Sequence, residues 1–113
     1  MKTHESDLQI VCVKWFRLQY PNAIIAAIPN GGKRSAITAS ILKNEGVLAG
    51  MPDLIIPCAR KGYNGLFIEM KYGKNRLSPS QIQVMIKLRQ EGYRSEVCYT
   101  FDEFVELCNE YLG

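Results

Sequence analysis

Histidine is nearly absent from this 113-residue chain, which contains only His4 beside 14 Lys and Arg and 11 Asp and Glu residues. The four cysteines form neither a CxxC pair nor any other zinc-binding spacing. Each cysteine lies in an apolar stretch, so we expect reduced thiols that pack as small hydrophobic groups. The histidine and cysteine content therefore argues against a zinc site.

Long apolar runs are missing as well. None approaches the roughly 18–20 residues that a membrane-spanning helix needs, and the opening residues MKTHESDLQ are too polar for a signal peptide. A disulfide framework fits poorly with a chain that lacks an export signal. The apolar fraction of 47% and charged fraction of 22% exclude a disordered chain or a fibrous rod. We expect one intracellular domain over residues 1–113, without a membrane partner.

Nucleotide-binding and hydrolase motifs are also absent. The sequence contains no GxGxxG, P-loop or nucleophile elbow, so a small-molecule α/β enzyme has no support. The charges are unevenly distributed, because residues 1–94 carry 14 basic and 6 acidic side chains, whereas residues 95–113 carry 5 acidic and no basic ones. A basic body with an acidic C-terminal helix favours a polyanion-binding face. The alternative is that both are merely solvated surfaces.

Hydrophobic periodicity and turn residues predict eight alternating elements. In the expected helix over residues 5–20 the inward stripe contains Leu8, Val11, Cys12, Trp15 and Leu18. In the last helix, which Thr100 opens, we expect inward Phe101, Phe104, Val105 and Cys108. The other elements are strands at 23–28, 53–58, 66–72 and 95–99 and helices at 35–45 and 78–91. The order α-β-α-β-β-α-β-α predicts an α/β fold, with a mixed sheet between helices and an antiparallel hairpin over 53–72.

Polar residues interrupt two otherwise apolar segments, at residues 50–56 and 66–71. Side chains alternate along a strand, so Glu69 and Lys71 share one face. If Asp53 opens the neighbouring strand of the hairpin, its carboxylate can approach Glu69. Two adjacent carboxylates repel each other, and a divalent cation relieves that repulsion. Hard oxygen ligands suit Mg²⁺ or Mn²⁺.

Lys71 completes a set that suits phosphodiester hydrolysis. Its ammonium group would add positive charge for a phosphate, and it could orient or deprotonate the attacking water. The alternative is an exposed edge strand, on which Glu69 and Lys71 form a simple ion pair and Asp53 merely begins a strand.

The spacing of these motifs resembles a known family. The motif of the PD-(D/E)xK nuclease superfamily is similar to the pattern in this chain, where Pro52-Asp53 is followed after fifteen residues by Glu69-Met70-Lys71. More narrowly, the chain resembles a stand-alone virus-type replication-repair nuclease (VRR-NUC) domain. Several motifs in the right order carry this resemblance: Glu5 and residues 28–34, 42–46, 49–54, 65–71 and 77–81.

The resemblance implies a restriction-endonuclease-like fold and a role for each matching residue. Asp53, Glu69 and the backbone carbonyl of Met70 would hold the metal, and Lys71 would be the catalytic lysine. Glu5 would reach the metal directly or through water, and Gln81 would lie near the active site. Two simpler interpretations remain open: Glu5 complements the helix dipole at a frayed end, and Gln81 only completes a capping box with Ser78.

Basic residues around these motifs are candidates for DNA contacts. Asn30 and its glycines could present backbone N–H groups to a phosphate, or could simply form a strand-to-helix turn. The complete set of candidates comprises Asn30, Lys33, Arg34, Arg60, Lys61, Lys74 and Arg76.

The leading hypothesis from the sequence is a Mg²⁺- or Mn²⁺-dependent DNA endonuclease for structured DNA. Small stand-alone members of the family resemble Holliday-junction resolvases, which implies a homodimer acting on branched DNA. The alternative is a non-catalytic nucleic-acid-binding module or nuclease subunit on the same fold. For a small nuclease without a targeting signal we expect a cytoplasmic location, in a bacterial host or a phage-infected cell.

Overall fold

The computed structural model describes residues 4–29 and 35–113. The elements follow one another in the predicted order: α1 (His4–Gln19), β1 (Ala26–Ala27), α2 (Ala36–Asn44), β2 (Leu54–Ile56), β3 (Leu66–Met70), α3 (Pro79–Gln90), β4 (Arg94–Cys98) and α4 (Phe101–Leu112). The α/β class is therefore confirmed. Strands β1 and β2 are shorter than expected, since only two and three of their residues pair in the sheet.

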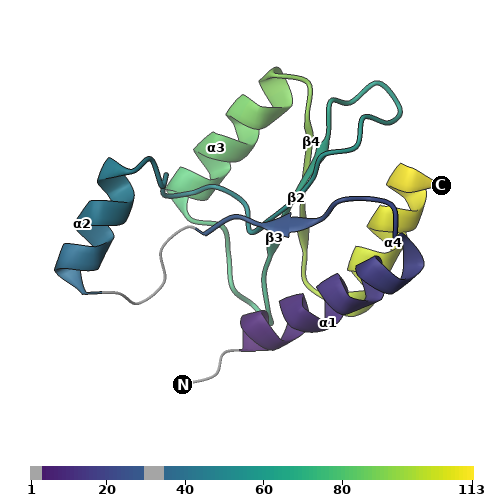
Figure 1. Ribbon diagram of the computed structural model, residues 1–113, viewed down its shortest axis with the longest axis horizontal. Helices are drawn as coiled ribbons and strands as arrows, with labels where there is room; N and C mark the ends of the chain where they lie inside the picture. The colour runs from purple at the N-terminus through teal and green to yellow at the C-terminus, as the bar shows by residue number, and fades with distance from the viewer. Residues whose placement is uncertain (1–3, 30–34) are drawn as a thin grey trace.

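A mixed sheet of order β1-β2-β3-β4 forms the centre of the molecule (Figure 1). Strands β2 and β3 form the predicted antiparallel hairpin, in which Leu54 lies opposite Ile68. Strands β3 and β4 are parallel, so α3 connects them as a crossover helix. This order makes β3 an internal strand, with a neighbour on each side.

The hydrophobic core lies on the side of the sheet that α1 and α4 cover. These two helices pack against each other, α1 also contacts β3, and α4 also contacts β4. The alternate residues of β3 (Leu66, Ile68 and Met70) point into this core, where they meet Phe16 of α1 and Tyr111 of α4. Phe67 lies on the opposite face, with its ring centroid 5.1 Å from that of Tyr93. The alternation predicted for this strand is confirmed.

The predicted phase of α1 was partly wrong. Val11 and Leu18 are 51% and 84% exposed, whereas Cys12 and Phe16 are buried. The stripe of α1 that packs against α4 and the rest of the core contains Leu8, Cys12, Trp15 and Phe16. This stripe has the same helical period as the predicted one, but it buries the Phe16 ring in place of the Val11 and Leu18 side chains. In α4, Leu107 and Tyr111 are buried in addition to Phe104 and Cys108, while Phe101 and Val105 are only half-buried.

The four cysteines are free thiols, and three of them are buried. Burial raises the pKa of the Cys98 and Cys108 thiols to about 12, which keeps both thiols protonated. Within the residues that the structure describes, no helix is both long enough and apolar enough to span a membrane.

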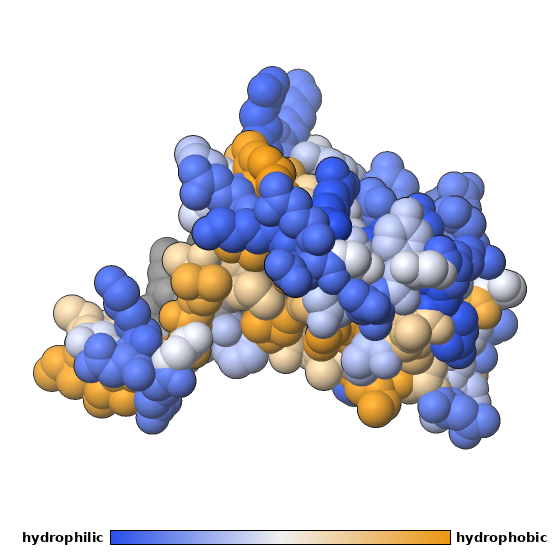
Figure 2. Space-filling view, turned by 90° about the horizontal axis from the view of Figure 1, so that it is seen from above, coloured by the Kyte–Doolittle hydropathy of each residue, from blue (hydrophilic) through white to orange (hydrophobic). Residues whose placement is uncertain are grey.

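Helix α2 stands apart from the rest of the fold (Figure 1). It packs against none of the other described helices and strands, and none of its residues is buried. In the space-filling view it forms a separate lobe that carries apolar side chains (Figure 2). Ile37 and Ile41 are 74% and 51% exposed. This apolar helix therefore has no packing partner among the helices and strands of residues 4–29 and 35–113.

Candidate active site

Glu69 and Lys71 come from the internal strand β3 and its continuation. Their exposed fractions are 4% and 9%, so the simpler interpretation of an ion pair on an exposed edge strand is wrong. The Lys71 N–H donates to the Cys98 carbonyl at 2.9 Å, which extends the pairing with β4 beyond the last strand residue. The Lys71 side chain leaves a fixed backbone, with Nζ 3.8 Å from Glu69 Oε2.

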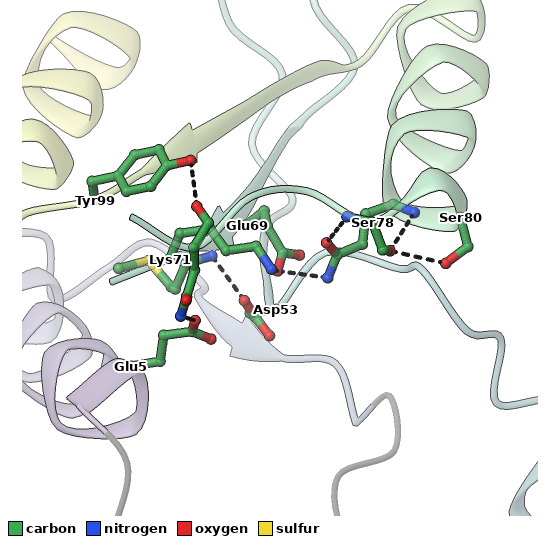
Figure 3. A network of polar contacts seen from close by, with 10 residues as sticks. Glu5, Asp53, Glu69, Lys71, Ser78, Ser80 and Tyr99 are labelled. Atoms are coloured by element: carbon green, nitrogen blue, oxygen red, sulfur yellow. Dashed lines mark hydrogen bonds and ion pairs between the residues drawn. The ribbon is translucent and has the colours of Figure 1, made fainter. Parts of the chain in front are cut away.

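Asp53 lies where the hairpin register brings it beside Glu69, because the next residue, Leu54, pairs with Ile68. Its Oδ2 accepts a hydrogen bond of 2.8 Å from the backbone N–H of Met70 (Figure 3). The Asp53 carbonyl accepts another from the N–H of Ile28, at 2.8 Å. Backbone groups on both sides of β2 therefore position Asp53, and the register places it beside Glu69, as the hairpin predicted.

The Glu69 carboxylate is only partly satisfied. Oε2 accepts a hydrogen bond of 3.0 Å from Gln81 Nε2, whereas Oε1 is buried without a hydrogen-bond partner. Burial, followed by the charge of Asp53, raises the pKa of Glu69 from 4.5 to about 8, while the Lys71 ammonium opposes this rise. A buried acceptor without a donor is costly, so the pair of carboxylates is set up to accept a positive charge.

This donor set fits a hard divalent cation. The orphaned Glu69 Oε1 and the adjacent Asp53 carboxylate supply two oxygen donors at one place, and a bound cation would displace the proton that the raised pKa keeps on Glu69. Within residues 4–29 and 35–113, no three His, Cys, Asp or Glu side chains converge to hold an ion by themselves. Mg²⁺ usually binds through one or two carboxylates and keeps water and substrate phosphate as its other ligands. The Met70 carbonyl stays a predicted ligand.

Glu5 lies in the first turn of α1 and faces the same region. Its negative charge is the smallest of the causes that raise the pKa of Glu69. Its Oε2 accepts a hydrogen bond of 2.9 Å from Asn75 Nδ2. Glu5 therefore does not join Asp53 and Glu69 in a three-carboxylate cluster, and its direct contact is with the segment that follows β3.

Gln81 serves both of the functions that the sequence left open. Its Oε1 accepts from the Ser78 N–H at 2.9 Å, and its own N–H donates to Ser78 Oγ at 3.2 Å, which completes the capping box of α3. Its Nε2 simultaneously donates to Glu69. The helix cap thus locks the amide that orients the Glu69 carboxylate (Figure 3).

Sequence reasoning missed the contribution of Gly50. This residue has a φ of +95°, and a Cβ added to it would lie 2.7 Å from the Ser80 carbonyl oxygen. Only glycine lets the segment before Asp53 pass so close to the first turn of α3. The sequence shows only a glycine three residues before Asp53. The reason for that glycine, its contact with Ser80, lies 30 positions further along the chain.

The predicted DNA-binding residues fall into three groups. Asn30, Lys33 and Arg34 lie outside the described residues. Arg60 and Lys61 lie in the turn that joins β2 to β3, more than about 10 Å along the hairpin from the carboxylates. The structure does not bring these two together with the site. Lys74 and Arg76, in contrast, follow Lys71 directly and are exposed.

Comparison with known proteins identifies the family of this domain. The sequence model of the VRR-NUC domain family matches residues 1–102. The chain belongs to the VRR-NUC family. A solved structure described as a VRR_NUC domain protein is 30% identical, covers 99% of this chain and 90% of its own, and gives a TM-score of 0.80. A second, described as a VRR_NUC domain, is 20% identical, covers 97% and 99%, gives a TM-score of 0.67 and supports the fold alone. No curated protein matches the chain.

Membership in the VRR-NUC family gives this domain a nuclease-type fold and a nuclease function in general terms, with DNA as the implied substrate. The family match also ends within α4, at residue 102. All of the residues that surround the carboxylate pair therefore lie within the matched region.

Proposed function

We propose that this VRR-NUC domain is a metal-dependent DNA endonuclease that hydrolyses phosphodiester bonds in structured DNA. The observation that carries the proposal is the pair of carboxylates of the half-buried Asp53 and the buried Glu69, with an unpartnered Glu69 Oε1 beside a buried lysine. A structural ion pair would not leave a buried carboxylate oxygen without a partner. A cation site accounts for it.

Asp53 and Glu69 would hold a Mg²⁺ or Mn²⁺ ion, together with the Met70 carbonyl. When bound, the ion supplies Lewis-acid activation of the phosphate and of the attacking water. The protein itself fixes the two carboxylates, through the Met70 N–H on Asp53 and the Gln81 amide on Glu69. Both ligands are therefore positioned before the substrate arrives.

Lys71 would act on the attacking water and on the phosphate. Its Nζ lies 3.8 Å from Glu69 and is held within a largely buried side chain. From there the ammonium group contributes positive charge where the pentavalent phosphate develops negative charge, and it donates a hydrogen bond that orients the water.

A homodimer would give this small domain the footprint that branched DNA requires. The exposed Ile37 and Ile41 of α2 lie on a helix that packs on no other described element, which supports a protein partner for that face. A two-fold pair would place two active sites on opposing strands of a four-way junction. Junction cleavage by paired active sites is therefore the form of the activity that we favour.

The test is cleavage of end-labelled four-way junction, flap and linear duplex DNA with Mg²⁺, Mn²⁺ or EDTA. The enzymes are the wild type, Asp53→Asn, Lys71→Ala and, as a matched control, Lys87→Ala on the exposed side of α3. We expect metal-dependent cleavage that favours the junction. Asp53→Asn and Lys71→Ala should lower the rate at least about 100-fold, and Lys87→Ala should retain it. Tight DNA binding without cleavage under any metal would instead identify a non-catalytic binding module.

A further inference from the structure

The segment that follows Lys71 is held in place from several directions at once. The Asn75 N–H donates to the Tyr72 carbonyl at 3.2 Å, which closes a tight turn, and Gly73 supplies the φ of +64° inside it. The Asn75 carbonyl accepts a hydrogen bond of 2.9 Å from the Tyr99 hydroxyl. The Asn75 amide donates to Glu5. All the polar groups that Asn75 offers from its backbone, and its side-chain amide, are thus engaged.

The anchors of this turn come from two distant parts of the chain. Glu5 belongs to the first turn of α1, and Tyr99 follows β4 (Figure 3). A second contact from α1 comes from His4, whose ring stacks on Tyr72 with centroids 4.7 Å apart and planes inclined by 18°. The first turn of α1 and the end of β4 therefore clamp the turn beside the active site.

Two basic side chains flank the clamped residue. Lys74 and Arg76 are exposed, and neither has an ion-pair partner within the part of the chain that the structure describes. Together with Gly73, Asn75 and Tyr99 they line a pocket of about 530 Å³. The clamp joins α1 to the end of β4, and it also places both charges at a defined distance from Lys71.

We propose that the turn over residues 72–76 is a phosphate subsite for the DNA strand beside the scissile bond, and that Glu5 positions this subsite through Asn75. Lys74 and Arg76 would contact a phosphodiester one or two nucleotides from the cleaved one. Glu5 is then a positioning residue for this DNA subsite, whether or not its carboxylate also reaches the cation. This inference rests on the proposed nuclease function.

The hydrogen bond that Asn75 donates to residue 5 requires an acceptor oxygen there, but it does not require that this oxygen be charged. Glu5→Gln preserves a side-chain oxygen that Asn75 can bond, whereas Glu5→Ala removes it. A role in holding a cation, directly or through water, depends on the negative charge that both substitutions remove. The glutamine variant therefore separates the two roles of Glu5.

The experiment measures DNA binding in EDTA by fluorescence anisotropy over a range of salt concentrations, and Mn²⁺ binding without DNA by calorimetry. The variants are Glu5→Ala, Glu5→Gln, Asn75→Ala and the double variant Lys74→Ala/Arg76→Ala, with Lys87→Ala as the control for loss of a single charge. The probe is the labelled four-way junction. Circular dichroism establishes that each variant is folded.

We expect Lys74→Ala/Arg76→Ala to weaken DNA binding and to lower the slope of log K against log salt by roughly 1–2, with Lys87→Ala having a smaller effect on affinity. Glu5→Ala and Asn75→Ala should weaken binding by a similar factor, of about three to ten, and their effects should not add in a further double variant, Glu5→Ala/Asn75→Ala. Glu5→Gln should bind DNA nearly as the wild type does, and Mn²⁺ affinity should stay within about twofold in Asn75→Ala.

An unchanged salt slope in Lys74→Ala/Arg76→Ala would overturn the phosphate subsite. A loss of Mn²⁺ affinity in both Glu5 variants, with normal DNA binding by Asn75→Ala, would overturn the assignment of Glu5. Failure of the proposed function is a different result, because the wild type itself would then cut no DNA with any metal.

Discussion

Replacing Glu69 with glutamine should make this protein more stable at neutral and alkaline pH while it abolishes cleavage. Burial and Asp53 raise the pKa of Glu69 from 4.5 to about 8, so the folded protein holds a proton that the unfolded chain releases across that window. The free energy of unfolding of the wild type must therefore fall as the pH rises from 4.5 to 8, and then level off. Glutamine is neutral at every pH in this range, so the free energy of unfolding of Glu69→Gln should not fall between pH 4.5 and 8 for this reason.

The size of the effect follows from the shift. At about 1.36 kcal/mol per pKa unit, the change from 4.5 to about 8 sets a ceiling of about 5 kcal/mol. The shift already includes the opposing charge of Lys71. Relaxation of the site around the half-buried Asp53 reduces the effect further, so we expect about 2–3 kcal/mol at pH 8 and less than about 0.5 kcal/mol at pH 4.5. The glutamine can retain the oxygen that accepts from Gln81 and turn its amide toward Asp53.

The assay is urea denaturation of both proteins between pH 4.5 and 9 in EDTA. Glu91→Gln, at the C-terminal end of α3, serves as the control for loss of an exposed carboxylate. Adding Mg²⁺ at pH 7.5 should stabilise the wild type and leave Glu69→Gln unchanged, because only the carboxylate holds the cation. A stability difference between Glu69→Gln and the wild type that does not vary with pH would refute the reasoning. So would equal stabilisation of both proteins by Mg²⁺.

Three further predictions concern the surroundings of the site. Gly50→Ala should lower the free energy of unfolding by about 2 kcal/mol or more and slow cleavage, because φ is +95° and the added Cβ would lie 2.7 Å from the Ser80 carbonyl oxygen. The control Gly46→Ala, at φ +109°, meets no atom and should lower it by only about 1 kcal/mol. Similar urea midpoints for the two variants would contradict this. Gln81→Glu retains the oxygen that caps α3 but sets a carboxylate against Glu69, so it should raise the pKa of Glu69 further and weaken Mn²⁺ binding in calorimetry. Gln81→Ala loses the cap and should lower the free energy of unfolding by about 1 kcal/mol. Ile37→Asp/Ile41→Asp should convert a dimer into a folded monomer in sedimentation equilibrium; a wild type that is already monomeric at micromolar concentration would remove the basis for the dimer.

The sequence predicted best what depends on near neighbours along the chain. The order of elements, the hairpin over 53–72 and the two faces of β3 follow from periods of two and 3.6 residues and from turn residues. The juxtaposition of Asp53 and Glu69 followed as well, because a hairpin fixes which residues lie opposite each other. For the same reason the capping box of Ser78 and Gln81 could be recognised.

Contacts between distant segments could not be predicted in this way. The phase of α1 depended on which of two apolar stripes α4 accepts, so Val11 and Leu18 were wrongly placed inside. The Glu5–Asn75–Tyr99 chain of hydrogen bonds joins three segments that carry no mutual signal in a single sequence. The burial of Glu69 and the pKa that follows from it needed the position of β3 between β2 and β4.

The proposed cleavage reaction requires a cation held by Asp53 and Glu69. The measurement is the single-turnover rate of four-way junction cleavage as a function of Mg²⁺ concentration, for the wild type and for Asp53→Asn at equal DNA saturation. We predict a rate that rises and saturates with Mg²⁺ in the wild type, and a rate lowered at least about 100-fold in Asp53→Asn at every Mg²⁺ concentration. Cleavage that persists in EDTA, or that Asp53→Asn performs as fast as the wild type, would contradict the account.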